Sequence, residues 1–592
     1  MGKLFATLGC VVGLAAATGT VHAADDAASR FHAIYAQEWA WRQAQFQGLD
    51  DEDSQGAPAD HLPRVDAATQ TMRERYWADV LKQLDAIKPT ELHGEDAVNY
   101  AVYRFQIETL LADQRFRTWE MPFNSDSGFW SDLGFTARAS FTTLQQYKDY
   151  IGKLRDIPRY FGEETDNMRL GLARGFSQPR IILQGRTQSI SDVADAPGQG
   201  NLFYTPFRHM PAIIPADEQA RLRAEALAAI KDAVVPAYAK LLRFMQDEYI
   251  PKARTGIAAE DLPDGKAFYQ SQIREYTTLD MSPDAIHQLG LEQMAIIHRQ
   301  MLDTMMQAGF KGSFADFLHF LRTDPRFYAK TPDELLKDAA WIAKQVDGKI
   351  GDYIGHLPRR RFAIEPVPAD LAPIYTGGRG GPGIYLVNTY NLPSRPLYSL
   401  PALTLHESSP GHALQMPLAA EMTGLPDFRR YSYISAYGEG WALYSEYLGQ
   451  EMGIYHTPYE QFGYLSYQAW RAARLVVDTG IHHLHWTREQ AQDYLRENTA
   501  LADHEIETEV DRYIAWPAQA LSYYLGEMAI RQDRERAEKA LGPKFDIRAF
   551  HDAVLSTGSV PLPVLNRRID QFIADGGKSP WADDKHGSCK SP

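Results

Sequence analysis

The chain has 592 residues and a formal net charge of −15 at pH 7. This length predicts a large core or several lobes, and the acidic balance argues against a nucleic-acid-binding protein. Hydrophobic residues make up 44% of the chain and charged residues 23%, as is usual for a soluble globular protein.

The N-terminus has the layout of an export signal. Lys3 provides a positive charge, residues 4–17 are mostly apolar, and residues 21–23 form a plausible cleavage site. The apolar run is too short to span a bilayer as a helix, and no later run is long enough. We therefore predict a signal peptide at residues 1–23 and a periplasmic protein without a membrane span. Lipoprotein anchoring through Cys10 is the less favoured alternative.

The chain contains two cysteines, Cys10 and Cys589. Removal of the signal peptide leaves one, so we expect neither an intrachain disulfide nor a cysteine metal site. We assign residues 24–578 to a single helical domain, built as one body or as two lobes. Residues 579–592 are a polar tail.

Apolar residues at helical spacing dominate the chain. The longest such segments are residues 65–87, 94–116, 144–172 and 215–249. Further helices are predicted to begin after the N-cap residues Ser282, Thr331 and Thr487.

Strand patterns are confined to residues 361–364 and 383–388. The glycine-rich residues 376–383 lack the strand–loop–helix context of a phosphate-binding loop, so we interpret them as a flexible connector or the edge of a lid. The predicted fold class is mainly α, with two lobes around a deep cleft and a small β-sheet beside the functional site.

The segment HESSPGH, from His406 to His412, is the strongest candidate for a functional site. In the H-E-x-x-H pattern, two zinc-binding histidines four residues apart share one helix face. Histidines six residues apart lie about 120° apart around a regular helix. Pro410 disrupts a helix and Gly411 permits unusual dihedral angles, so a break there would bring both rings to one ion. An unbroken helix over residues 404–414 would exclude this hypothesis; the alternative is two unrelated histidines.

Two carboxylates follow in an apolar helical segment. Glu439 and Glu446 are seven residues apart, which places them about 20° apart around a helix. Buried carboxylates need a partner, and a zinc ion held by two histidines and a glutamate keeps a fourth position for water. The alternative is an ordinary ion pair with Arg429, Arg430 or Arg474.

Two strings that contain these residues resemble a known family. LHESSPGHALQ and YGEGWALYSEYLG are similar to segments of the bacterial "domain of unknown function 885" family, whose members are similar to zincin metallopeptidases of the gluzincin kind. The likeness extends over nearly all the mature chain and is sharpest from about residue 383 to residue 526.

The resemblance implies a large helical zincin-like fold that holds one Zn²⁺ ion. It implies His406 and His412 as metal ligands, Glu439 as the third ligand and Glu407 as the general base. Ala413 departs from the family pattern, because many members have a second histidine there; that histidine is therefore not essential for the metal.

Amide hydrolysis at such a site needs donors for the developing oxyanion. The candidates are His482, Tyr513, Tyr523 and Tyr524. Asp478 lies four residues before His482 and would orient its ring, and Glu446 would support the metal ligands from behind. The alternative for His482 is a histidine that only suits the dipole of a helix end.

Substrate contacts are predicted at two places. Arg512 is a candidate clamp for a substrate carboxylate, and a salt bridge with Glu509 or Asp511 is an equally favoured alternative. If residues 385–389 form an exposed edge strand, Tyr385 and Asn388 would lie beside an extended peptide. The acidic run at residues 503–509 is interpreted as a solvated face rather than a second metal site.

The predicted function is a zinc-dependent hydrolase that cleaves amide bonds of short peptides, as a carboxypeptidase or an oligopeptidase. One alternative is an iron-dependent redox enzyme, although the paired E-x-x-H segments of di-iron bundles are missing. The other is a non-catalytic metal-binding protein.

Overall fold

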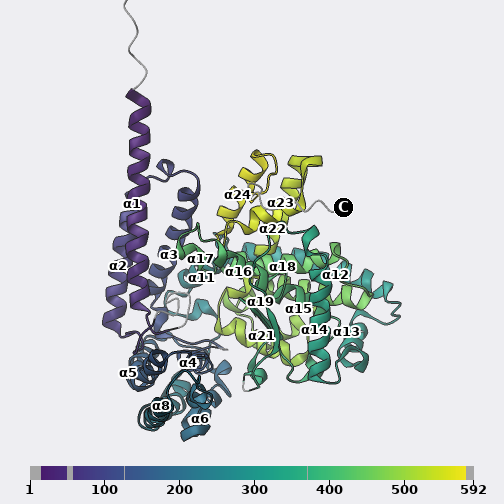
Figure 1. Cartoon of the computed structure of the whole chain (residues 1–592). Coiled ribbons are helices and arrows are strands. Elements are labelled where there is room, and N and C mark those ends of the chain that lie inside the picture. The colour runs from purple at the N-terminus through teal and green to yellow at the C-terminus, as the bar shows by residue number, and fades with distance from the viewer. Residues whose placement is uncertain (1–14, 50–57, 126, 370, 582–592) are drawn as a thin grey trace, which may run out of the picture.

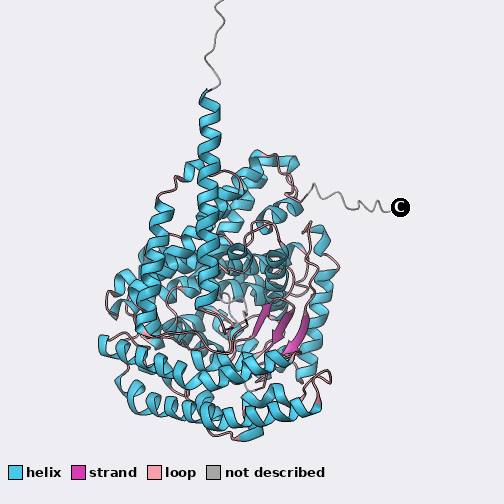
Figure 2. Cartoon of the chain, turned by 60° about the vertical axis from the view of Figure 1, so that its left-hand side comes forward, coloured by secondary structure: helices cyan, strands magenta, loops and turns pink. Residues whose placement is uncertain are grey.

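The computed structural model describes residues 15–49, 58–125, 127–369 and 371–581. Most of the predicted signal peptide and of the polar tail lies outside the described residues. Helices dominate the structure, and three short strands lie together among them (Figure 2), which confirms the mainly α fold class and the small sheet. Within the part of the chain that is described, no helix is long and apolar enough to cross a membrane.

Long helices fill the four predicted segments of the first half, and a further long helix before them was not predicted. α1 (Ala15–Gln45), α2 (Ala67–Asp85) and α3 (Glu95–Phe116) stand side by side at the left of Figure 1. The segment at residues 215–249 is helical throughout, with π-helical turns between α8 (Ala216–Ala229), α9 (Val235–Phe244) and α10 (Ile250–Lys252). The remaining helices of this half are α4 (Phe129–Thr136), α5 (Leu144–Arg174), α6 (Gln188–Ala194), α7 (Thr205–Arg208) and α11 (Gly265–Thr277).

The second half is also mainly helical, and three of its helices begin at the predicted caps. The side chains of Ser282, Thr331 and Thr487 each accept a hydrogen bond from the backbone N–H three residues later. The helices of the second half are α12 (Pro283–Gln307), α13 (Phe314–Thr323), α14 (Pro332–Asp347), α15 (Leu400–Glu407), α16 (His412–Glu421), α17 (Asp427–Arg430), α18 (Ser435–Glu451), α19 (Pro458–His482), α20 (Arg488–Asn498), α21 (Asp503–Ala515), α22 (Ser522–Leu541), α23 (Ile547–Leu555) and α24 (Leu562–Ala574).

The sheet is mixed and has the order β1–β3–β2. β1 (Ala363–Pro366) pairs parallel with β3 (Ile384–Val387), and β3 pairs antiparallel with β2 (Gly378–Gly381). Two expectations are therefore wrong. The glycine-rich segment contains a strand rather than only a flexible connector, and β3 is the central strand rather than an exposed edge, because it is hydrogen-bonded on both sides.

Two large hydrophobic clusters each unite distant parts of the chain. One includes Leu154 of α5 and Val476 of α19, and the other includes Tyr103 of α3 and Trp441 of α18. The helix α19 is buried at every position from residue 462 to residue 482. Each cluster thus fixes helices of the second half against helices of the first.

Glycines bring α18 and α22 into backbone contact. A Cβ atom built on Gly526 would lie 1.9 Å from the carbonyl oxygen of Ala436, and one built on Gly440 would lie 2.5 Å from the carbonyl carbon of Gly526. This approach sets the position of Glu439 on α18 relative to Tyr523 on α22.

We expect Gly526→Ala to lower the free energy of unfolding by about 1–3 kcal/mol, because backbone atoms must move apart to admit the methyl group. Urea denaturation measures the effect. The matched control is Gly162→Ala in α5, where an added Cβ meets open space; it should raise stability by about 0.5–1 kcal/mol. Equal effects of the two changes would show that the α18–α22 contact is not tight.

Candidate metal centre

The helix breaks where the sequence predicts a break. α15 ends at Glu407 and α16 begins at His412, so no continuous helix runs over residues 404–414. The N–H of Gly411 donates to the carbonyl of Leu405 at 3.1 Å, and a Cβ at Gly411 would lie 1.9 Å from the carbonyl oxygen of His406. Only glycine fits this fold-back. Trp441 of α18 holds the turn by donating from Nε1 to the carbonyl of Pro410 at 2.7 Å.

The fold-back brings the two imidazoles to one carboxylate. Nε2 of His406 lies 3.4 Å from Oε2 of Glu439, and Nε2 of His412 lies 3.3 Å from the same oxygen. Ligands about 2.0–2.1 Å from a tetrahedral ion stand about 3.3–3.4 Å apart. The side chains are thus spaced as the ligands of one small ion would be.

These three residues form the candidate metal site. Among the residues that the structure describes, they are the one group of three or more His, Cys, Asp or Glu side chains that converges in this way, with all ligand atoms within 4.8 Å of one another. Oε2 of Glu439 is buried and makes no hydrogen bond. A buried charged oxygen that faces two imidazole nitrogens needs a cation between them, so the residues fit a metal ion.

Glu446 lies behind His406 rather than in the ligand group. Its Oε1 is 2.8 Å from Nδ1 of His406, and both side chains are buried. Burial lowers the pKa of His406, but contacts with Glu439 and Glu446 raise it to about 9. The carboxylates therefore favour positive charge at this position. The bond at Nδ1 also leaves Nε2 to face Glu439, an arrangement in which Glu446 orients the ring from behind.

Glu407 is held by the glycine-rich strand. Its Oε2 accepts a hydrogen bond from the N–H of Gly380 in β2. The strand passes so close that a Cβ on Gly380 would lie 1.9 Å from the carbonyl oxygen of Glu407, whereas a Cβ on Gly381 would meet open space. β2 thus positions this carboxylate beside the metal site.

Gly380→Ala should displace β2 from α15 and lower thermal stability, with a cost of about 1–3 kcal/mol for overpacking. Gly381→Ala, one residue along the same strand, should leave the melting temperature nearly unchanged. Differential scanning calorimetry of both variants makes the comparison. A tolerated Gly380→Ala would contradict the close approach of β2 to Glu407.

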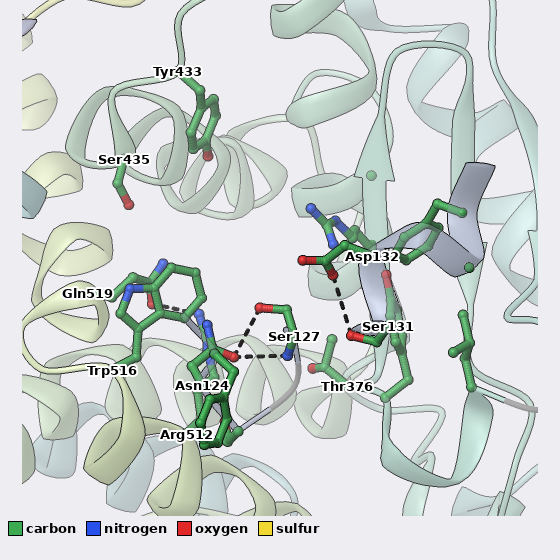
Figure 3. Close-up of a pocket in the computed structure, with 18 of the residues that line it drawn as sticks. Asn124, Ser127, Ser131, Asp132, Thr376, Tyr433, Ser435, Arg512, Trp516 and Gln519 are labelled. Atoms are coloured by element: carbon green, nitrogen blue, oxygen red, sulfur yellow. Dashed lines mark hydrogen bonds between the residues drawn. The ribbon is translucent and has the colours of Figure 1, made fainter. Parts of the chain in front are cut away.

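The candidate metal site opens into a cavity of about 1380 Å³. One part of its wall comes from the helices and loops of the first half, including residues 123–138 and 185–208. The opposite part comes from residues 403–416, 431–439 and 505–523. In Figure 3, Asp132 and Ser131 face Tyr433, Trp516 and Arg512 across the open space.

Two of the residues predicted to contact substrate or the oxyanion line this cavity. Tyr523 lies with its ring stacked near that of His406, at a centroid separation of 6.2 Å. Arg512 donates to the hydroxyl of Tyr523 at 3.0 Å and to Gln519 at 2.6 Å. Its contact with Glu509 is longer, at 3.5 Å, and Asp511 pairs with Arg488 instead.

The other predicted oxyanion donors do not line the cavity. His482 is fully buried, and its ring contacts the N–H of Ala259 and the carbonyl of Tyr513. The hydroxyl of Tyr513 accepts hydrogen bonds from Trp470 and Arg474, and that of Tyr524 donates to Gln293 beside a separate pocket. These three side chains support surrounding helices.

The expected pairing of Asp478 with His482 does not form. Asp478 accepts hydrogen bonds from the hydroxyl of Tyr269 and the N–H of Ala518. Burial lowers the pKa of His482 to about 3, so this ring is neutral and is not a positive charge at a helix end. Each side chain satisfies groups of a different neighbouring segment, which the four-residue spacing could not reveal.

Tyr385 and Asn388 are also placed differently from the prediction. Tyr385 is fully buried in the central strand, and the amide of Asn388 donates to the carbonyls of Ala372, Tyr375 and Thr376. Asn388 therefore holds the loop that precedes β2. It does not lie beside the cavity.

Within the described residues, Arg429, Arg430 and Arg474 pair with other carboxylates than Glu439 and Glu446. Glu446 pairs with Arg471 at 3.5 Å, whereas Arg474 pairs with Glu509. Arg471 and Gly380 are the site residues that the sequence analysis missed. A signal existed for Arg471, since it is a charge within the apolar run QAWRAARLVV.

The geometry can be compared with known proteins. The family described as "Bacterial protein of unknown function (DUF885)" matches residues 42–569. The chain is similar, at 27% identity and a TM-score of 0.84, to the crystal structure of "the putative lipoprotein from Colwellia psychrerythraea", over 93% of this chain and 99% of that one. A "putative lipoprotein of unknown function from Shewanella oneidensis" has 17% identity and a TM-score of 0.63 over 91% and 99%, and shares the fold. No curated protein matches the chain.

Proposed function

This chain belongs to the DUF885 family, whose function is unknown, and from its own site we propose that it is a zinc-dependent hydrolase of amide bonds in short peptides. The observation that carries the proposal is the position of Glu407. A carboxylate fixed by the N–H of Gly380 adjoins a convergent group of two histidines and a glutamate in the wall of a large cavity. That combination suits activation of water better than electron transfer.

The donor set favours zinc. Two imidazole nitrogens and one carboxylate oxygen, spaced as the corners of a tetrahedron, are the ligands of many catalytic zinc sites. His406, His412 and Glu439 would hold the ion. A bound zinc ion would supply Lewis acidity and would lower the pKa of a water molecule at its open position.

The chain's own residues would then move the protons and bind the oxyanion. Glu407 would accept a proton from the attacking water and deliver it to the leaving nitrogen. The hydroxyl oxygen of Tyr523 accepts a hydrogen bond from Arg512, so its own proton is left for the substrate carbonyl oxygen. Of the four candidates, Tyr523 is therefore the proposed oxyanion donor, since His482, Tyr513 and Tyr524 do not line the cavity.

The cavity suits a peptide in an extended conformation. Its volume of about 1380 Å³ exceeds the roughly 300–1,000 Å³ of ordinary small-molecule pockets. β2 is an edge strand whose residues 378–380 line the cavity, and such an edge can pair with a peptide backbone. The proposed substrates are short peptides rather than folded proteins.

Two observations favour an exported location, which is compatible with the cleavage of peptides outside the cytoplasm. The Colwellia psychrerythraea protein is described as a "putative lipoprotein", and the N-terminal sequence of this chain has the layout of an export signal. We propose a periplasmic protein that acts on peptides there, with anchoring through Cys10 as the less favoured form.

A mixed library of short peptides tests the function. The zinc-loaded protein should cleave a subset of the library, with products identified by mass spectrometry, and metal analysis should give one zinc per chain. Stoichiometric iron with oxygen-dependent turnover would instead support the redox alternative. Bound zinc without any cleavage would favour a non-catalytic binding protein.

A further inference from the structure

Arg471 is a buried cation whose guanidinium group has few hydrogen-bond or ion-pair partners. Its side chain is 4% exposed, and neither Nε nor Nη1 has a hydrogen-bond partner. Nη2 lies 3.5 Å from Oε1 of Glu446, which already contacts His406. A buried guanidinium normally satisfies its N–H groups, because each unpaired one costs free energy. This arginine is therefore kept at a cost to stability.

Arg474 lies one helical turn further along α19 and is also incompletely bonded. It donates to Glu509 and to the hydroxyl of Tyr513, but Nη1 has no partner. The Cζ atoms of Arg471 and Arg474 lie 3.9 Å and 4.5 Å from the ring centroid of Trp470. Stacking on this shared indole fixes the planes of both guanidinium groups.

Both arginines line the cavity that contains the candidate metal site, as does Arg512. Figure 3 shows Arg512 beside Gln519 at the edge of the open space. The surrounding cluster consists of Arg395, Arg471, Arg474 and Arg512 with Glu446, Glu505 and Glu509. Four positive side chains thus face three negative ones in this cluster, so one further negative charge would balance it.

The arginines lie close to the proposed scissile position. The Cζ atom of Arg474 is 4.3 Å from the ring centroid of Tyr523, and that ring is 6.2 Å from the ring of His406. An extended peptide advances about 3.3–3.6 Å per residue. One to three substrate residues would therefore bridge the metal and the arginines.

We propose that Arg471 and Arg474 form a subsite for a substrate carboxylate, which directs cleavage to a bond one to three residues from that group. The inference rests on the proposed function for its cleavage step, but not for the binding of the carboxylate. Guanidinium groups bind carboxylates through paired, charge-assisted hydrogen bonds. The carboxylate is either the C-terminus of the peptide or an acidic side chain near it. If the carboxylate is the C-terminus, the enzyme would be a carboxypeptidase that removes one to three residues from the end of the peptide.

Binding can be measured separately from cleavage in the zinc-loaded Glu407→Gln protein. Three probes are titrated by calorimetry: N-acetyl-trialanine with a free carboxylate, the same peptide as its C-terminal amide, and that amide with glutamate as its last residue. The free acid should bind about 10- to 100-fold more tightly than the neutral amide, as expected for a charged hydrogen-bonded contact. Tight binding of the glutamate amide alone would identify a side-chain carboxylate as the ligand.

Arg471→Met in the same background distinguishes a binding role from a structural one. The preference for the carboxylate should fall below about threefold. The change also removes the 3.5 Å ion pair with the buried Glu446, so a lower melting temperature is expected to accompany it, and the preference is the deciding measurement. Arg471→Lys should restore part of the preference. Arg208→Gln is the control, because Arg208 lines the same cavity but is exposed and donates to the carbonyl of Gln199.

The inference is overturned if neither the free acid nor the glutamate amide binds more tightly than the neutral amide, or if none of the three probes binds at millimolar concentration. It is also overturned if Arg471→Met weakens both probes alike or lowers the melting temperature without changing the preference. Absence of cleavage by the wild type, with the carboxylate preference intact, would reject the proposed function and leave the subsite standing.

Discussion

Replacement of Glu407 by glutamine is expected to lower kcat/KM for a cleaved peptide by about 10²- to 10⁴-fold, the usual contribution of a general base. Glutamine has nearly the same shape, but its amide cannot accept the proton of the attacking water. Glu407 is not in the group of ligand atoms, so bound zinc should remain at one per chain. Steady-state kinetics and metal analysis of one preparation give both results.

An exposed glutamate provides the matched control. Glu497→Gln makes the same chemical change on the surface of α20 and should leave kinetics and zinc content unchanged. If Glu407→Gln cleaved peptides at the rate of the wild type, Glu407 would lose its proposed role. If it lost zinc, its effect on activity would have to be assigned to the metal site instead.

Glu439→Gln is expected to remove tight zinc binding. Loss of a residue that only supports a ligand costs about 10- to 100-fold in metal affinity, so loss of this ligand should cost more than about 100-fold. In the wild type, free zinc at 100 times its Kd should stabilise the fold by about 2.7 kcal/mol. Thermal denaturation with and without zinc should show this gain in the wild type and not in the variant.

Glu446→Gln, measured in the same experiment, compares the loss of a supporting residue with the loss of a ligand. Its carboxylate contacts Nδ1 of His406 and lies behind the ligands, so its loss should weaken zinc binding by only about 10- to 100-fold. Equal losses in the two variants would contradict the distinction between a ligand and a supporting residue. Retention of full zinc affinity by Glu439→Gln would reject the proposed ligand set.

Local sequence patterns predicted the long helices of residues 65–87, 94–116, 144–172 and 215–249 and three capped helix starts, because caps and apolar spacing act over one or two turns. Ser282, Thr331 and Thr487 each begin a helix as expected. β2 escaped prediction because the sequence GRGG has no alternation of apolar and polar side chains. Its strand conformation depends on pairing with β3 and on the close packing against Glu407, neither of which is a local property.

The candidate site likewise has some features that depend on short segments and others that depend on contacts between distant segments. The break at Pro410 and Gly411 could be predicted because it is a property of one short segment, and so could the shared helical face of Glu439 and Glu446. The choice of Glu439 as the third ligand came from the family resemblance. The partners of His482 and Arg471 come from contacts over long sequence distances, such as Ala259 with His482. No spacing rule predicts which packed element satisfies a buried side chain.

The split between α15 and α16 also has a consequence for motion. Since His406, His412 and Glu439 come from three different helices, an ion bound by them would cross-link α15, α16 and α18. The chain itself joins the first two through the turn at residues 408–411 and the last two through residues 422–434, which include α17. Chelation should therefore speed amide hydrogen exchange first in this turn and at the start of α16. The buried α19 should stay protected until the whole fold opens.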